Sequence, residues 1–157
     1  ARLEEKKWGP FRDLVASGLT AVMTTHALYP ALDPDHPATF SARIVDRVKN
    51  RPDVEGAVLT DDLEMGAVGK HYPMGHAAVA AIEAGHDLAL VCRRRDYIDE
   101  CRQALVAAVS GGRLSPERLA DARRRSAKLL AELELIRPDD QTLNEWFGRL
   151  AESDAEE

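Results

Sequence analysis

Three short apolar runs constrain the fold of this chain more than any other feature. They span residues 20–24 (TAVMT), 57–60 (AVLT) and 87–91 (DLALV). None of them alternates polar with apolar side chains, which predicts strands buried on both faces, as in a parallel sheet covered by helices. Segments with helical spacing lie between the runs, and strands that alternate with helices are typical of βα units.

The segments between the runs carry recognisable helix ends. Ser41 is placed to cap a helix that reaches about Lys49, because a hydroxyl at this position accepts a backbone N–H bond. Gly85 is placed to end a helix over residues 75–84 in the left-handed conformation. Both helices therefore fit between predicted strands.

Two longer helices are expected after the third run. Asp96 is placed to cap the first of them, and Gly111 to end it. Ser115, followed by a proline, begins a second helix that reaches about residue 135. A weaker helical pattern covers residues 142–150.

Charge is concentrated at the C-terminal end. The formal net charge is −6, and residues 137–157 hold seven carboxylates against two arginines, so most of the charge lies there. We expect this segment to be a solubilising acidic tail with a short helix. A nucleic-acid surface needs clustered Lys and Arg, and a membrane span needs roughly 20 apolar residues. The sequence therefore predicts neither nucleic acid nor membrane as a partner.

The two cysteines and the N-terminus bear on location. Cys92 and Cys101 have no CxxC spacing, and no signal-peptide core follows the charged first residues. Either the protein is intracellular or the start of the gene product is missing; a cytoplasmic location is the expectation. Cys92, at the end of the third run, reads as a small core residue.

Polar residues follow each apolar run, at the carboxyl ends where parallel α/β proteins gather functional groups. His26 follows the first run, Asp61 and Asp62 the second, and three arginines, residues 93–95, the third. They would share one rim of the sheet and could line a pocket for a polar substrate. The arginines fit either a solvated turn or an anion site.

A metal site is not expected. His26, His71, His76 and His86 are spread over three loops, and no pair has the one-turn spacing of a HExxH motif. We therefore predict no metal and no cofactor.

Three stretches together carry a family resemblance. AVMTTHALYPALDPDHPATFS, GAVLTDDLEMGAV and AGHDLALVC, in this order, resemble consecutive parts of the family 3 glycoside hydrolases, and in particular the bacterial β-N-acetylhexosaminidases of the NagZ type. The resemblance covers about residues 3–136. It implies an α/β fold in which residues 1–136 form three consecutive C-terminal βα units of a (β/α)₈ barrel. Residues 137–157 form the acidic tail.

The resemblance also implies a nucleophile. In that family the seventh strand ends in a Ser/Thr-Asp pair whose Asp attacks the sugar, and the matching residue is Asp61, directly after Thr60. Its carboxylate would form a covalent glycosyl-enzyme that water hydrolyses with retention. His26, Asp62 and Met65 are candidate substrate contacts beside it. Other interpretations stay open: His26 orients Asp61 or packs, Asp62 caps the next turn, and Met65 packs.

The second catalytic group of that family has no counterpart in this sequence. An Asp-His pair on a mobile loop serves there as general acid/base, after a Lys-His-Phe-Pro-Gly-His-Gly stretch. GKHYPMGH, residues 69–76, is similar in wording but follows Asp61 instead of preceding it, so we treat it as unrelated. The rest of the same barrel, a missing N-terminal segment, is therefore an expected partner, and the chain alone should be inactive.

The implied function is hydrolysis of terminal β-linked N-acetylglucosamine, of the peptidoglycan or muropeptide recycling type. The expected partner is thus an N-acetylglucosamine-containing carbohydrate. A family 3 β-glucosidase-like hydrolase and a non-catalytic partial-barrel binding module are the alternatives. The DDLEM form and the short C-terminus without a second sandwich domain favour the hexosaminidase.

Overall fold

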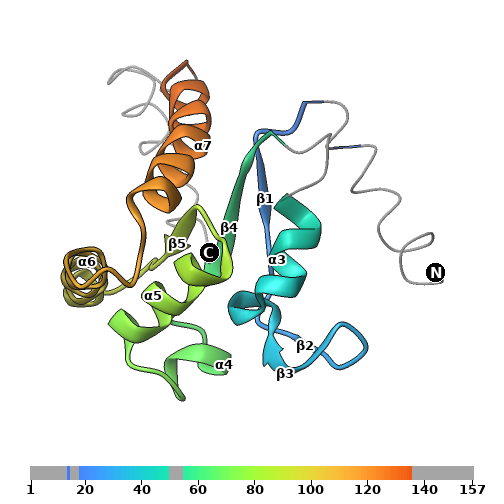
Figure 1. The fold of residues 1–157 in the computed structure, drawn as a ribbon, viewed down its shortest axis with the longest axis vertical. Helices are drawn as coiled ribbons and strands as arrows, with labels where there is room; N and C mark the ends of the chain where they lie inside the picture. The colour runs from blue at the N-terminus through green and yellow to red at the C-terminus, as the bar shows by residue number, and fades with distance from the viewer. Residues whose placement is uncertain (1–13, 15–17, 50–54, 136–157) are drawn as a thin grey trace, which may run out of the picture.

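The computed structural model describes residues 14, 18–49 and 55–135, so the predicted helix at 142–150 and the predicted tail lie outside the described residues. In Figure 1 the strands run through the centre and the helices lie around them. The elements are β1 (Ala21–Met23), β2 (Leu28–Tyr29), β3 (Asp33–Pro37), η1 (Ala38–Phe40), α3 (Ala42–Lys49), β4 (Ala57–Asp62), α4 (Gly66–Gly69), α5 (Met74–Ala84), β5 (Leu88–Leu90), α6 (Arg95–Ser110) and α7 (Pro116–Leu135).

The three predicted strands form one parallel sheet. β4 lies in the centre, with β1 on one side and β5 on the other. The predicted parallel α/β arrangement is therefore confirmed. β4 is longer than expected: it continues past Thr60 through Asp61 and Asp62. Pairing with β5 extends it, because the N–H of Leu63 still donates to the carbonyl oxygen of Leu90 at 3.0 Å.

The helices cover one face of this sheet. Val58 packs with Val45 of α3 and Ala84 of α5. Since successive side chains of a strand point to opposite faces, Leu59 and its register partner Met23 point away from these helices. Met23 is 55% exposed. The prediction that every strand is buried on both faces is wrong, because within the described residues the helices cover one face only: β1 and β5 have no buried residue, and Leu59 of β4 is half-buried.

Four of the predicted capping positions are confirmed, including Gly111 at the C-cap of α6. The hydroxyl of Ser41 accepts the N–H of Ile44 at 3.2 Å, and the hydroxyl of Ser115 accepts the N–H of Arg118 at 3.2 Å. Gly85 ends α5 with φ +117°, a conformation that favours glycine. Local residue types were therefore sufficient to place these ends.

The predicted cap of α6 is wrong. The helix begins at Arg95, its N-cap position is Arg94, and no side chain of that residue caps it. The carboxylate of Asp96 instead pairs with the guanidinium of Arg94, which lies 3.9 Å from the centre of the Tyr97 ring. The N–H groups of the turn directly before α6 are bound by another carboxylate, described below.

The Pro-rich segment after β1 forms the antiparallel β2–β3 hairpin. Asp33 holds its base, accepting the hydroxyl of Ser41 at 2.6 Å and the N–H groups of Asp35 and His36 at 3.0 and 3.2 Å. These bonds, led by that from Ser41, lower the pKa of Asp33 to about 2. The hairpin is thus tied to the start of α3, and His36 is exposed.

A buried carboxylate joins four elements at the amino end of β5. Asp87 accepts the Nζ of Lys49 (α3) at 2.5 Å and the N–H of Val58 (β4) at 3.0 Å. Arg118 of α7 reaches the same carboxylate at 3.3 Å. The side chain of Asp87 is 0% exposed, so these partners replace its water shell.

Gly56 brings the starts of β1 and β4 together. The N–H of Ala57 donates to the carbonyl oxygen of Thr20 at 2.9 Å. A Cβ at Gly56 would lie only 2.5 Å from that oxygen. This close approach of two backbones therefore requires glycine.

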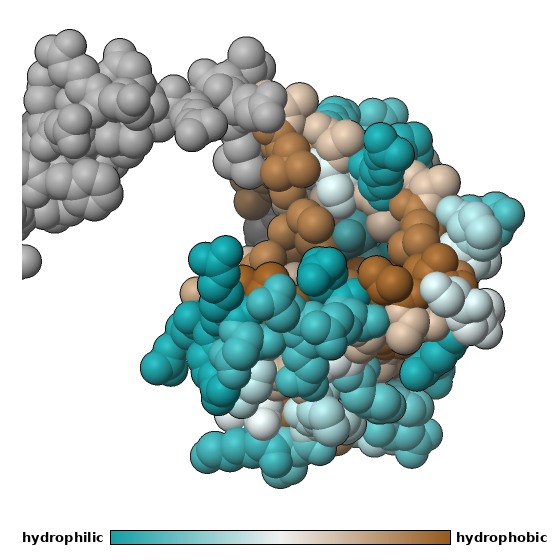
Figure 2. Space-filling model, turned by 90° about the vertical axis from the view of Figure 1, so that its left-hand side faces the viewer, coloured by the Kyte–Doolittle hydropathy of each residue, from teal (hydrophilic) through white to brown (hydrophobic). Residues whose placement is uncertain are grey.

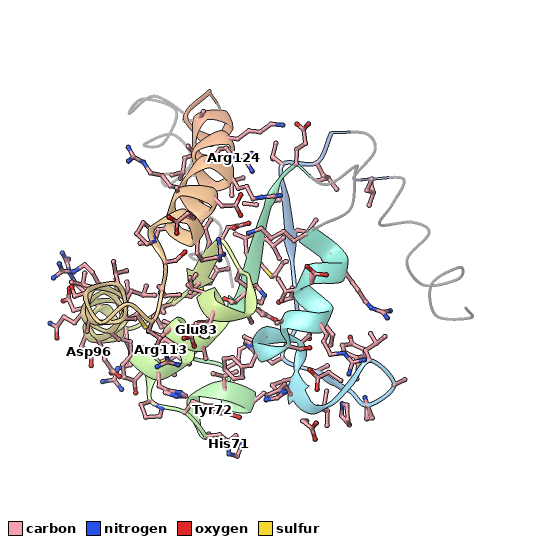
Figure 3. The ribbon with its side chains drawn as sticks, viewed as in Figure 1. His71, Tyr72, Glu83, Asp96, Arg113 and Arg124 are labelled. Atoms are coloured by element: carbon pink, nitrogen blue, oxygen red, sulfur yellow. The ribbon has the colours of Figure 1, made fainter. Side chains whose placement is uncertain are left out.

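On the outer surface, an ion pair links α5 to the α6–α7 connection. Arg113 donates to Glu83 through Nε at 2.5 Å and through Nη2 at 2.6 Å, and Figure 3 shows the two side chains together. Such a two-bond arrangement is geometrically specific. It therefore helps to fix where α7 begins.

Large hydrophobic side chains are also exposed, among them Ile98 and Val106 of α6 and Leu130 of α7. Figure 2, which faces the side where α6 lies, shows hydrophobic side chains gathered in a band rather than scattered.

In the described part of the chain, no helix has the length and apolar character of a membrane span.

His86 ties the end of β1 to α5 beneath the helices. Its ring is fully buried, with Nδ1 3.1 Å from the carbonyl oxygen of Ala81 and Nε2 2.8 Å from the hydroxyl of Thr24. A carbonyl oxygen only accepts, so Nδ1 carries the proton and the Thr24 hydroxyl donates to Nε2 of the neutral ring. Burial lowers the pKa of His86 from 6.5 to about 4.

This shift predicts a loss of stability in mild acid. Between pH 6.5 and 4, His86 is protonated in the unfolded chain but stays neutral in the folded protein. The free energy of unfolding therefore falls as the pH falls. From pH 7 to 5 the fall from this group is about 2 kcal/mol, measurable by urea unfolding. His86→Gln should have a lower free energy of unfolding than the wild type at pH 7. Between pH 7 and pH 5, however, its free energy of unfolding should fall by less than that of the wild type.

His71→Gln is the matched control, because His71 is exposed just before α5 and its label in Figure 3 lies at the edge of the molecule. This variant should keep the wild-type difference between pH 7 and pH 5. A wild-type difference in His86→Gln would contradict the role given to His86.

Candidate active site

The carboxyl end of β4 holds Asp61 on a rigid strand. Thr60 is fully buried, and its hydroxyl accepts the N–H of Leu90 at 3.0 Å. Asp61 is the next residue, and it lies where the pairing of β4 with β5 shifts register, between Leu59 and Asp62. Its Oδ1 accepts the N–H of Asp62 at 2.8 Å, and the residue is half-buried.

His26 supports the same strand end from the loop after β1. It is 9% exposed, and Nε2–H donates to the carbonyl oxygen of Asp62 at 2.8 Å. Nδ1 lies 2.6 Å from the hydroxyl oxygen of Thr39, which lies 3.2 Å from the carbonyl oxygen of Thr25. The structure therefore brings His26 to the Asp61–Asp62 pair, as the shared rim predicted. Substrate contact by His26 stays a prediction.

The other two acids of DDLE bind backbone. Asp62 caps the turn after β4, since its Oδ1 accepts the N–H of Glu64 at 3.1 Å. Oε2 of Glu64 accepts the N–H groups of Cys92, Arg93 and Arg94 at 3.1, 2.5 and 3.4 Å. The arginine turn, residues 93–95, was considered as an anion site. The carboxylate of Glu64 already occupies backbone N–H groups of this turn. Sequence reasoning gave Glu64 no role, because no local pattern links it to that turn.

Met65 and Cys92 complete the rim. Met65 is 47% exposed, so it is not a core residue, and its contact with substrate stays a prediction. Cys92 was expected in the core and this is wrong: β5 ends at Leu90, and Cys92 falls in the exposed loop that follows. Partial desolvation, together with the charges of Asp62 and Glu64, raises the pKa of the Cys92 thiol.

The arrangement suits chemistry by a carboxylate. A carboxylate at a fixed strand end can act as nucleophile or general base once a reacting atom lies within reach. Among residues 14, 18–49 and 55–135, no three His, Cys, Asp or Glu side chains gather as a metal site. His86 already uses both ring nitrogens under the helices.

Comparison with known proteins supports the sequence resemblance. The profile of the glycosyl hydrolase family 3 N terminal domain matches residues 1–129. A β-hexosaminidase from Nitrosomonas eutropha is 36% identical over 104 residues, which are 66% of this chain and 30% of that protein. One from Alkalilimnicola ehrlichii is 41% identical over 90 residues, 57% of this chain and 26% of that protein. The chain thus spans less than a third of these relatives.

Solved structures agree with this result. A glycoside hydrolase family 3 β-N-acetylglucosaminidase from Paenibacillus sp. FPU-7 has a TM-score of 0.81 and 38% identity, over 88% of this chain and 27% of that one. The β-N-acetylglucosaminidase from Thermotoga maritima has a TM-score of 0.73 and 26% identity, over 83% of this chain and 29% of that one. The parallel α/β fold is therefore shared with proteins of that description.

The contacts of His26 predict the effect of removing the Thr39 hydroxyl. Thr39→Val keeps the shape of the side chain but leaves Nδ1 of the buried ring without its partner. The free energy of unfolding should fall by about 1–3 kcal/mol, measured by urea unfolding at pH 7. Thr25→Val is the control, because its hydroxyl accepts an exposed N–H, that of Ala27 at 3.3 Å. It should cost under about 0.5 kcal/mol; equal losses in both variants would contradict the role of Thr39.

Proposed function

Because the chain belongs to glycosyl hydrolase family 3, we propose that it forms part of a retaining glycoside hydrolase whose nucleophile is Asp61. The position of Asp61 carries this proposal: it lies at the carboxyl end of the central strand of a parallel sheet, where active sites of such folds gather. Within the described residues its carboxylate accepts one hydrogen bond, from the N–H of Asp62. The neighbouring acids, Asp62 and Glu64, are already engaged with backbone N–H groups.

The reaction follows from this geometry in two steps. A carboxylate oxygen of Asp61 attacks the anomeric carbon as the glycosidic C–O bond breaks, and a general acid protonates the departing oxygen. The same group then takes a proton from water, whose oxygen attacks the anomeric carbon and releases Asp61. Two inversions give net retention. The strand end and His26 keep Asp61 from moving during both steps.

The general acid/base requires a second segment. We infer that it belongs to the part of the barrel that this sequence does not contain, held roughly 5 Å from Asp61. Residues 1–136 would be three C-terminal βα units of the (β/α)₈ barrel, and residues 137–157 an acidic tail. The half-exposed β1 and β5 support this proposal, because edge strands ordinarily find a neighbour.

The proposed substrate is a terminal β-linked N-acetylglucosamine. The names of the relatives, β-hexosaminidase and β-N-acetylglucosaminidase, support it. A peptidoglycan-derived glycoside processed in the cytoplasm is the finer proposal. The alternatives to this proposed function are a β-glucosidase and a non-catalytic binding module.

Asp61→Asn in the complete protein tests the nucleophile. The substitution keeps the size of the side chain and removes the charge that attacks, so kcat should fall roughly 10³-fold or more while the protein stays folded. A 2-fluoro glycoside should label the wild type covalently, and peptide mapping should place the label on Asp61. Asp96→Asn is the control, because Asp96 is an exposed acid in the first turn of α6. This variant should keep wild-type turnover. Activity near wild type in Asp61→Asn would end the assignment.

Substrate choice is tested with two aryl glycosides. Co-expression with the segment that completes the barrel should give hydrolysis of an aryl β-N-acetylglucosaminide, and at least about tenfold lower kcat/KM for the aryl β-glucoside. The reverse preference would favour the β-glucosidase. Hydrolysis of neither compound would favour a binding module, and muropeptides would then be tested for binding alone.

A further inference from the structure

Glu64, from a distant part of the chain, binds the turn that leads into α6 and ends at its N-cap residue, Arg94. Arg94, at the N-cap position, makes no side-chain cap. One carboxylate oxygen of Glu64 accepts three consecutive N–H groups there, those of Cys92, Arg93 and Arg94. Bonds to an ionised acceptor are strong, and a negative charge at this end of a helix is favoured by the helix dipole. The contact therefore docks the turn after β4 onto α6.

The same turn carries a continuous series of hydrogen bonds back to Asp61. The N–H of Glu64 donates to Asp62 Oδ1 at 3.1 Å, and the N–H of Asp62 donates to Asp61 Oδ1 at 2.8 Å. Leu63, between them, is 0% exposed, and its N–H donates to the carbonyl oxygen of Leu90 at 3.0 Å. A displacement of Glu64 would therefore be passed to the Asp61 carboxylate within three residues.

We propose that Glu64 is a positioning residue that holds Asp61 in its attacking geometry by docking the β4–α4 turn on the N-terminus of α6. This inference rests on the proposed function of Asp61. It assigns to Glu64 no contact with substrate; its effect passes through the turn. Attack by an oriented carboxylate is sensitive to displacements of about 1 Å, so a loosened turn affects the chemical step more than binding.

Glu64→Ala tests the proposal against a matched loss of a helix cap. Ser115→Ala removes the side chain that caps α7 and should lower Tm by a similar amount. In the complete protein, Glu64→Ala should lose roughly 10- to 100-fold in kcat with KM within about threefold of wild type. Ser115→Ala should keep kcat. Full activity in Glu64→Ala, or an equal loss in Ser115→Ala, would overturn the proposal.

Glu64→Gln provides the conservative rescue. Its amide oxygen can reach the same N–H groups, whereas the charge is gone. The variant should therefore recover most of the kcat lost in Glu64→Ala and most of the protection of the turn. A Glu64→Gln protein as slow as Glu64→Ala would contradict docking through hydrogen bonds.

Hydrogen exchange gives a readout that does not depend on turnover. Glu64→Ala should speed exchange in peptides covering residues 56–65 and 91–98, and Ser115→Ala should not. Asp61→Asn measured beside them separates the two proposals. An inactive Asp61→Asn with a fully active Glu64→Ala overturns only the role of Glu64, whereas an active Asp61→Asn overturns the proposed function.

Discussion

The buried carboxylate of Asp87 is the contact on which the rest of the fold depends. It receives Lys49 from α3 and Arg118 from α7, and both cations also bind the carbonyl oxygen of Gly85, at 3.1 and 2.8 Å. Lys49 further pairs with Asp121 of α7 at 2.7 Å. Removing one partner would leave a buried charge unpaired, which costs far more than losing a surface pair. Helices distant in sequence are thus held to the sheet by charge as well as by apolar packing.

The two ends of the parallel strands carry different kinds of interaction. Charged anchors gather at the amino end of β5, whereas a network of hydrogen bonds around Asp61 occupies the carboxyl end of β4. His86 connects the two regions, because its ring lies under α5 and reaches Thr24 directly before the loop that carries His26. The loop that carries His26 is therefore held at its start by His86, whose ring stays neutral at ordinary pH.

Local sequence predicts the parts of this fold that depend on local chemistry. The strands follow from apolar runs, and the caps Ser41 and Ser115 from short side chains that bond nearby N–H groups. Contacts between distant segments escape such reasoning: Glu64 meets the start of α6 only after β4 and β5 pair, and Cys92 lies in the loop because β5 ends early. Asp61 was singled out from Asp62 by the family resemblance, since their position after the strand left the two acids equivalent.

The close approach at Gly56 has a consequence at the opposite end of the strand pair. A methyl group there would act as a wedge, 2.5 Å from the carbonyl oxygen of Thr20, and would force the start of β1 away from β4. Because His26 lies on the loop that follows β1, the pairing that Gly56 permits between β1 and β4 also bears on the contact of His26 with the Asp62 carbonyl. A glycine at the start of β4 thus contributes to the support of Asp61 from the opposite end of the same strand.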